Sequence, residues 1–326
     1  NILRTSGATI TRNSPASFIS VGQPQRGHPM TNTPPIAAEH SFTEFTPMKR
    51  PGWVKDRKVI RCVTCGFWHQ HPYPVSQELK EFYADYYNPT ASPNRREVLD
   101  TSTSLWKGKA PGKVLDIGCG DGELLNLFVK KGWKSTGIEI SQAKITSLDP
   151  AIRFFNSMLY DVDRAQLGRF DIINTSFVLE HVPNPLEFCA YIHDHLLEPG
   201  GIFVCEVPND FTLIQKAVLA KTKKDEYWVA FDHLNYFDFD TLEALLMKAG
   251  LKPLLRDASY PMEFFALMGE DYIGNEPVGK SCNAKRLSFE QALESHGLHD
   301  LKRKLYFKLA ELGIGRSVIV YSKKGK

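Results

Sequence analysis

The sequence predicts an α/β protein with a doubly wound, mainly parallel sheet. Between residues 113 and 260, short apolar runs alternate with stretches that have the length and periodicity of helices. Crossover helices of this length place neighbouring strands parallel and cover both faces of the sheet. The first apolar run ends in a glycine cluster, and the composition, with 42% hydrophobic and 24% charged residues, is that of a globular chain.

Each element of this region has its own local signal. The amphipathic stretches stop at Gly132, at Pro199-Gly200 and at Gly250, which is typical of helix C-termini. We expect strands at residues 114–117, 135–140, 152–155, 170–174 and 202–207. We expect helices at residues 123–131, 185–197 and 239–249.

Three segments lie outside this alternating pattern. Residues 1–40 are rich in Ser, Thr, Pro and Gly, and they predict a disordered leader. Residues 41–110 predict a separate N-terminal module, with a strand at 58–61 and a Tyr-rich helix at 76–87. Residues 261–316 predict a helical insertion, with a helix at about 301–312, acting as a substrate cap or a dimer contact. Residues 317–326 would then return to the sheet as its last strand.

Charge and cysteine content exclude several classes. The chain has 40 basic and 37 acidic residues, and the near-neutral balance gives no electrostatic footprint for nucleic acid. No apolar run approaches the roughly 18 residues of a membrane span. Six cysteines are too few for a disulfide scaffold, so we expect a reducing, cytoplasmic compartment.

The glycine cluster predicts a ligand site at the end of the first strand. It reads Asp116-Ile-Gly-Cys-Gly-Asp-Gly122, and alternate glycines allow a tight turn and the close approach of a ligand. A dinucleotide fingerprint would need a third glycine at position 123, which is Glu123, and Asp121 would repel a pyrophosphate. A zwitterion with one carboxylate and one ammonium fits this loop better. Glu139 ends the second strand, where a carboxylate can accept both hydroxyls of a ribose.

These residues together resemble the class I S-adenosylmethionine-dependent methyltransferases. Residues 114–122 are similar to the first motif of that family, and residues 137–140 to its second. Residues 170–183 resemble the fourth-strand motif of its small-molecule members, and 197–204 resemble the turn into the fifth strand. The resemblance implies a Rossmann-like sheet of seven strands, methyl transfer, and S-adenosylmethionine as the cofactor.

The resemblance also implies a role for each matching position. The methionine end of the cofactor would be lined by Asp116, Gly118, Cys119 and Gly120. Glu139 would hold the ribose hydroxyls, and Ile140, Ser157 and Met158 would contact the adenine. Thr175 and Ser176 would lie under the sulfonium.

The N-terminal module resembles that of sugar-modifying methyltransferases in this class. Those modules bind zinc through two Cys-x-x-Cys pairs, whereas this chain has only Cys62 and Cys65. His69 and His71 are spaced too tightly for a ribbon arm, so we expect no metal. The predicted helix with Tyr83, Tyr86 and Tyr87 would either close over the cofactor or pack in a core.

The predicted substrate is a small molecule, and the module favours a sugar, nucleotide-linked or within a surface polysaccharide. O-methylation of a quinone-like or phenolic acceptor is the alternative, because residues 179–183 resemble that group too. A catalytically silent methyltransferase-fold protein is the alternative of another class. A homodimer is compatible with the insertion.

Proton removal from the acceptor requires a base close to the methyl group. We expect His233 in this role, because it follows the fifth strand at the carboxyl edge of the sheet and its ordinary pKa of about 6.5 suits a hydroxyl proton. His181, just after the fourth strand, is the alternative, and Glu206 would orient the base.

Overall fold

The computed structural model describes residues 41–48, 57–73, 95–108, 110–141 and 148–325. The predicted leader and the predicted Tyr-rich helix lie outside these ranges.

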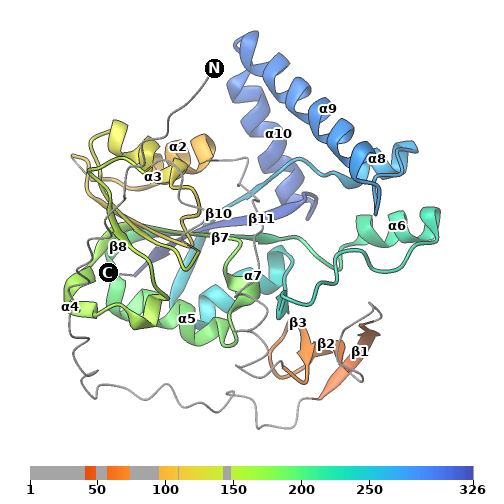
Figure 1. Cartoon of the computed structure of the whole chain (residues 1–326), viewed down its shortest axis with the longest axis horizontal. Helices are drawn as coiled ribbons and strands as arrows, with labels where there is room; N and C mark the ends of the chain where they lie inside the picture. The colour runs from red at the N-terminus through yellow and green to blue at the C-terminus, as the bar shows by residue number, and fades with distance from the viewer. Residues whose placement is uncertain (1–40, 49–56, 74–94, 109, 142–147, 326) are drawn as a thin grey trace, which may run out of the picture. The chain divides into compact units, whose positions relative to one another are not determined.

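A seven-stranded sheet organises the described chain, as the sequence predicts (Figure 1). Its strand order is β10-β11-β8-β7-β4-β5-β6. The strands β8, β7, β4, β5 and β6 are all parallel to one another. β11 runs antiparallel to both of its neighbours, β8 and β10. The bounds are β4 Lys113–Ile117, β5 Lys134–Ile138, β6 Arg153–Phe155, β7 Phe170–Ser176, β8 Leu197–Pro208, β10 Leu251–Ala258 and β11 Ser317–Lys324.

Each central strand buries both of its faces. Along β4, Val114 packs into one hydrophobic cluster and Leu115 into the other, since successive side chains of a strand point to opposite faces. Figure 1 shows α2 and α3 over one face, and α5 and α7 over the other. The helices are α2 Arg95–Leu105, α3 Glu123–Lys130, α4 Arg164–Leu167, α5 Pro185–Tyr191, α6 Leu213–Thr222 and α7 Phe239–Lys248.

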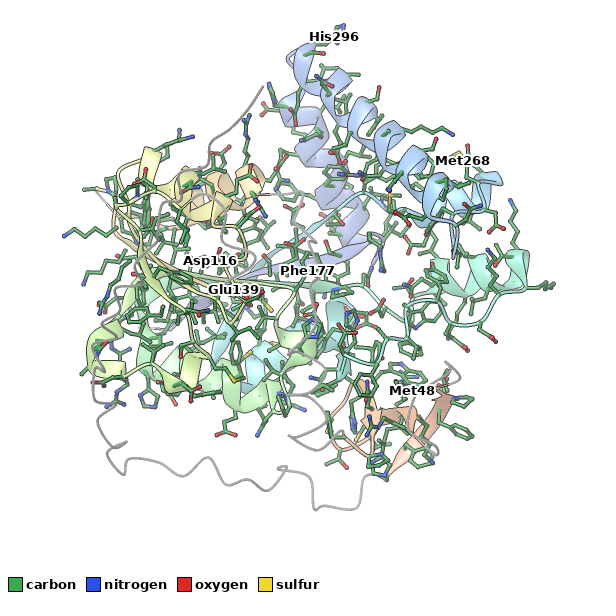
Figure 2. All side chains as sticks on the ribbon, viewed as in Figure 1. Met48, Asp116, Glu139, Phe177, Met268 and His296 are labelled. Carbon is green, nitrogen blue, oxygen red and sulfur yellow. The ribbon has the colours of Figure 1, made fainter. Side chains whose placement is uncertain are left out.

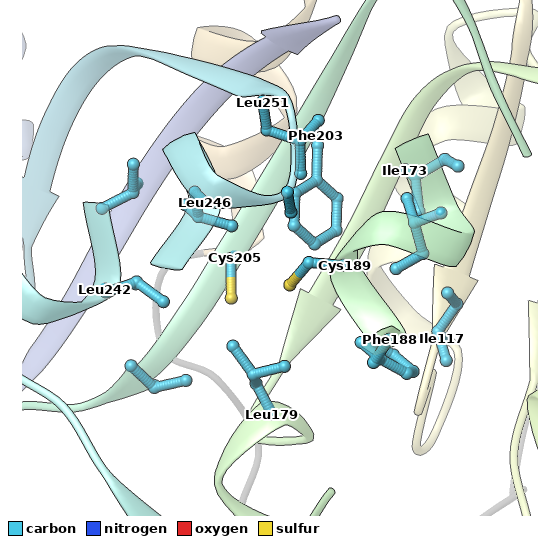
Figure 3. Close-up of a cluster of buried hydrophobic side chains, with 14 of the residues drawn as sticks. Ile117, Ile173, Leu179, Phe188, Cys189, Phe203, Cys205, Leu242, Leu246 and Leu251 are labelled. Carbon is cyan, nitrogen blue, oxygen red and sulfur yellow. The ribbon is translucent and has the colours of Figure 1, made fainter. Parts of the chain in front are cut away.

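The α5 and α7 side forms the larger core (Figure 3). Phe203 and Cys205 of β8 pack there against Cys189 of α5 and Leu246 of α7, all of them buried. The two cysteines fill small apolar positions between helix and sheet.

The helix predicted at 185–197 is confirmed up to Leu196, although its last turn is not α-helical. α5 continues into a π-helical turn at Ile192–Leu196, and β8 begins at Leu197, which pairs with Phe170. The segment Glu198-Pro-Gly-Gly lies between two paired positions of β8, because Leu197 pairs with Phe170 and Ile202 pairs with Ile172 and Lys323. The register with β7 shifts across this segment, in keeping with its turn-forming composition.

A second sheet holds the N-terminal module. Its order is β1-β2-β3-β9, and every pair is antiparallel. The strands are β1 Phe42–Pro47, β2 Lys58–Cys62, β3 Trp68–His71 and β9 Asn235–Tyr236. The fourth strand is contributed by the segment between α6 and α7, so the module is completed by the larger domain.

The segment before β11 is helical. It contains α8 Glu263–Met268, α9 Glu276–Ser295 and α10 His299–Glu311. α10 packs on β10 and buries Tyr306 and Ala310. Among the described residues, none of the helices has both the length and the apolar run required to cross a bilayer.

Candidate active site

The predicted site residues gather at the carboxyl ends of β4, β5 and β7. In this strand order β5 lies on one side of β4 and β7 on the other, so the order reverses at β4. Ligands of open α/β sheets bind at such a point, because the loops after the strands diverge there. Figure 2 labels Asp116, Glu139 and Phe177, which lie at or directly after the ends of β4, β5 and β7.

The loop after β4 is shaped by its glycines. Gly118 has φ +75° and Gly120 has φ +55°, in a region where a side chain is strained. A Cβ on Gly118 would lie 2.4 Å from Val178 Cγ2, whereas a Cβ on Gly120 would meet no atom of the described residues within 4 Å. The described part of the chain therefore leaves room for a ligand to approach the backbone of Gly120.

Glu139 joins this loop to the end of β5. Its Oε2 accepts a hydrogen bond from Gly120 N at 3.0 Å, and its Oε1 accepts one from Ser141 N at 2.8 Å. The carboxylate is only 5% exposed. It is thus held in a fixed position beside the glycine loop, with lone pairs remaining for two hydroxyls.

Asp116 lies at the end of β4 and is 4% exposed. Its Oδ1 accepts a hydrogen bond from Asn174 Nδ2 at 2.7 Å. Burial raises the pKa of Asp116 to about 7, although Asn174 and the nearby Arg95 oppose this shift. A buried carboxyl poised near neutrality can ionise when a cation binds beside it.

Exposed apolar side chains lie at the ends of β5 and β6. Ile140 is 51% exposed and Met158 is 60% exposed, which suits residues that contact a flat aromatic ring. Asn156 Nδ2 donates to the backbone oxygens of Glu139 and Ile140, at 2.8 and 3.1 Å, and connects the two strand ends. Ser157 Oγ donates to the backbone oxygen of Met158.

Two predicted cofactor contacts point into the core instead. The Cys119 side chain is 6% exposed in the α2–α3 cluster, and a Cβ on Gly137 would lie 2.8 Å from its Sγ. Thr175 is fully buried beside Cys205. Alternation along β7 instead puts Asn174 and Ser176 on the Asp116 side, where Asn174 Nδ2 lies 3.3 Å from Ser176 Oγ.

Phe177 follows β7 with a strained backbone. Its φ is +55°, which is uncommon for an aromatic residue, and its N–H donates to Glu206 O at 2.9 Å. Strain of this kind is concentrated at functional sites. The turn directs the chain into a 3-10 helix, Leu179–His181, that carries the next functional residues.

Both predicted bases lie together in a polar cluster after β7. The rings of His181 and His233 pack edge to face, with centroids 5.1 Å apart. His181 Nδ1 lies 2.7 Å from Asp232 O, and His181 Nε2 lies 3.8 Å from Glu180 Oε1. Because a carbonyl only accepts, His181 Nδ1 carries the proton and Nε2 is the basic atom.

Burial makes His233 a weak base. Burial and the neighbouring His181 lower the pKa of His233 to about 3, so His233 stays neutral and is a poor proton acceptor. Burial also raises the pKa of Glu180 well above its usual range. Glu206, the predicted orienting residue, accepts a hydrogen bond from Ser317 Oγ at 2.9 Å.

Sequence reasoning missed Gln70, which holds the His233 segment. Gln70 is fully buried on β3, and its Nε2 lies within hydrogen-bonding distance of the backbone oxygens of Ala230, Phe231 and His233, at 3.2, 2.7 and 2.9 Å. Nothing in the sequence near Gln70 signals this contact, because its partners are about 160 residues away.

Arg95 was missed for the same reason. It begins α2, and its Nη1 lies 2.9 Å from Asp121 Oδ1 and also pairs with Glu123. Its positive charge offsets the negative charges of Asp121 and Glu123, the two residues that make a pyrophosphate unfavourable in this loop.

The fold and the site define an α/β protein that binds a small ligand at the switch point, through a glycine loop and two strand-end carboxylates. The family described as "Methyltransferase domain" matches residues 83–255, which is more than half of the 326 residues, and the chain belongs to this family. S-adenosylmethionine, the cofactor predicted from the sequence, is accordingly the cofactor of the family.

Several known proteins are similar to the chain. The ubiquinone biosynthesis O-methyltransferase of Psychrobacter cryohalolentis is 31% identical over 122 residues, which are 34% of this chain and 46% of that protein. The same enzyme of Ruegeria pomeroyi is 28% identical over 153 residues, which are 44% of this chain and 61% of that protein. The chain thus spans about half the length of the curated relatives it matches.

Among solved structures, Burkholderia thailandensis 1,6-didemethyltoxoflavin-N1-methyltransferase, with its substrate and S-adenosylhomocysteine bound, is 14% identical. The similarity covers 87% of this chain and 100% of that chain, with a TM-score of 0.47.

Proposed function

We propose that the chain uses S-adenosylmethionine to methylate a hydroxyl of a small phenolic or quinol-like acceptor. The observation that carries this proposal is the arrangement at the switch point, where Glu139, Asp116 and Gly120 surround one open edge of the sheet. Membership in the methyltransferase family supports the reaction class.

Each end of the cofactor has matching groups at this edge. Glu139 would accept the two ribose hydroxyls, and Ile140 and Met158 would contact the adenine. Asp116 would face the ammonium group, since its buried carboxyl gains most from a neighbouring cation. Backbone N–H groups in the first turn of α3 would suit the carboxylate, beyond Glu123 N, which donates to Asp121 Oδ1. Asn174 and Ser176 replace Thr175 as the side chains assigned to the sulfonium region.

The bound cofactor supplies an electrophilic methyl group. The chain must therefore align the acceptor oxygen with the methyl–sulfur bond and take up its proton. We assign proton removal to His181 Nε2, because Asp232 O orients the ring and Glu180 lies beside it. His233 is assigned a packing role against that ring.

The strength of this base favours a phenol over a sugar. The ordinary pKa of imidazole, about 6.5, is some 3–4 units below that of a phenol near 10. An aliphatic hydroxyl resembles water, with a pKa of roughly 15.7, and is matched much less well. The curated relatives are named as ubiquinone biosynthesis O-methyltransferases, which supports the phenolic acceptor, and none of the relatives we describe supports the sugar.

A screen with methyl-labelled cofactor tests the acceptor class. We expect label in catechols and hydroxylated quinols and none in nucleotide sugars. Label in nucleotide sugars alone would restore the sugar as acceptor, and cofactor binding without any transfer would favour a silent protein.

Variants of the two histidines test the base. We expect His181→Ala to lose roughly 100-fold or more in turnover while keeping its affinity for S-adenosylhomocysteine. His233→Phe, which keeps the ring contact, should lose much less. The reverse order of losses would return the role of base to His233.

A further inference from the structure

We propose that Cys62, Cys65 and His69 form a zinc site in the N-terminal module. The two sulfurs and one nitrogen of the His69 ring all lie within 4.8 Å of one another. Sulfur ligands of a tetrahedral zinc, each about 2.3 Å from the metal, are separated by about 3.8 Å, so only a small contraction is needed. Two thiolates and one imidazole are ligands that zinc prefers.

The hairpin explains why the short sequence spacing does not prevent a site. In a zinc ribbon the metal ligands lie on two separate arms, which the spacing of His69 and His71 does not allow. Instead, Cys62 ends β2, Cys65 lies in the turn, and His69 is on β3, paired with Ile60 of β2. The turn therefore brings all three residues to one end of a single hairpin.

The turn itself has a geometry suited to a thiolate. Cys65 N donates to Cys62 Sγ at 3.3 Å, and Gly66 N donates to Cys62 O at 3.0 Å. Gly66 has φ +86°, a conformation that glycine adopts without strain. An N–H directed at a sulfur stabilises negative charge on it, which a metal ligand requires.

His69 is oriented as a metal ligand would be. Its Nδ1 lies 2.7 Å from Gln70 O, and because the carbonyl only accepts, Nδ1 carries the proton and Nε2 is left with its lone pair. Histidine ligands commonly donate their second ring N–H to a backbone carbonyl in this way. The ring is fully buried and stacks on Tyr73, with centroids 5.0 Å apart.

The site would stabilise the part of the module that contacts the active-site edge. His69 pairs with Asn235 of β9, and Gln70 holds the backbone of the His233 segment. Zinc at this hairpin would therefore order that segment. The three ligands found among the described residues leave the fourth position of a tetrahedral zinc to water.

Metal content of the purified full chain tests the site. We expect one equivalent of zinc by mass spectrometry of the digested protein. Cys65→Ser and His69→Gln should weaken zinc binding beyond the roughly 10–100-fold that loss of an outer contact costs. Cys282→Ser and His71→Gln, which change a cysteine and a histidine outside the cluster, should retain it. No zinc in the wild type, or equal retention in all four variants, would overturn the proposal.

Alkylation of cysteines in the wild-type protein tests the zinc site even if the variants misfold. Zinc should protect Cys62 and Cys65 from iodoacetamide, and a chelator should remove this protection. A cobalt-loaded sample should show a thiolate charge-transfer band. Unchanged labelling after chelation, or a Cys62–Cys65 disulfide in protein purified under reducing conditions, would overturn the proposal.

Discussion

The carboxylates of Glu139 and Asp116 lie at the ends of the neighbouring strands β5 and β4, but their surroundings differ. The surroundings of Glu139 favour the ionised form, and those of Asp116 favour the protonated form. Glu139 accepts hydrogen bonds from two backbone N–H groups, whereas Asp116 accepts one from the neutral side-chain amide of Asn174 and is destabilised as an anion by burial. Backbone donors stabilise a carboxylate, while desolvation favours the neutral acid.

Cofactor affinity should depend on pH through Asp116. Its pKa of about 7 leaves the carboxyl largely protonated in mildly acidic solution, and a cationic ammonium favours the ionised form. We therefore expect binding to release a proton below pH 7, and affinity to rise with pH up to about 7. Calorimetry in two buffers of different ionisation enthalpy measures the release. Asp116→Asn should abolish it, and an absence of proton release in the wild type would contradict the assignment.

The raised pKa of Asp116 also makes the stability of the protein depend on pH. Because the pKa of Asp116 is raised on folding, its contribution to stability is present in acid and is lost as the pH rises through about 7. Burial lowers the pKa of His233, so stability from that residue is present above pH 6.5 and lost as the pH falls towards 3.

Loss of Glu139 should weaken cofactor binding directly. Glu139→Ala removes hydrogen bonds to a charged group, worth about 1.5–3 kcal/mol, so we expect S-adenosylhomocysteine to bind roughly 10–100-fold more weakly. Calorimetric titration measures the change. Glu198→Ala, at the opposite edge of the sheet, is the matched control. An unchanged dissociation constant for Glu139→Ala would place the ribose contact elsewhere.

Among the secondary-structure elements, the turn from β4 to α3 needs one glycine for packing and another for the approach of a ligand. Gly118 makes room for Val178, so it serves the fold. A Cβ on Gly120 would meet none of the described residues within 4 Å, so we expect its missing side chain to serve a ligand. The two glycines, two residues apart, are therefore separable by experiment.

Gly118→Ala should mainly reduce the stability of the fold, whereas Gly120→Ala should mainly reduce the affinity for the cofactor. Gly118→Ala adds a clash with Val178 to backbone strain, and we expect a loss of at least about 1–3 kcal/mol in the free energy of unfolding. Gly120→Ala should lose little more than the cost of its φ, about 1 kcal/mol, yet bind the cofactor at least about tenfold more weakly. Urea unfolding and calorimetry measure the two quantities. Equal losses of affinity in both variants would contradict this separation.

The elements that could be predicted from the sequence are those with local signals. β4, the glycine turn and α3 follow from an apolar run, a loop motif and a 3.6-residue period that are contiguous in sequence. The start of β8 could not be predicted, because pairing of Leu197 with Phe170 is a tertiary contact. Likewise Glu139 follows from its strand end, whereas Gln70, the side-chain direction of Thr175 and the grouping of His69 with Cys62 depend on segments that meet only in the folded chain.

At the scale of the whole molecule, the helical insertion is anchored to the methyltransferase core by charged groups. Lys302 of α10 is 4% exposed, and its Nζ lies 2.6 Å from Glu97 Oε1 of α2 and also pairs with Glu294. Arg303 pairs with Asp257 of β10. These contacts tie the insertion to both α2 and β10.

Removing the ammonium group of Lys302 should destabilise the protein. Lys302→Ala leaves two carboxylates without their partner, and we expect the free energy of unfolding to fall by about 1–3 kcal/mol. Lys308→Ala, which breaks an exposed pair with Glu311, should change it by less than about 0.5 kcal/mol. Urea unfolding of both variants provides the comparison, and equal values would show that the buried contact is not a stabilising one.

The position of β11 affects how the chain can fold during synthesis. β11 lies between β8 and β10, although the ribosome makes it after both of them. A nascent chain that has emerged as far as β10 therefore has no β11 to place between them, and the edge of β8 stays unpaired. An unpaired apolar edge invites association with other chains, and sheet contacts between distant segments form slowly. Until residues 317–324 emerge, this edge is a surface for chaperones to protect.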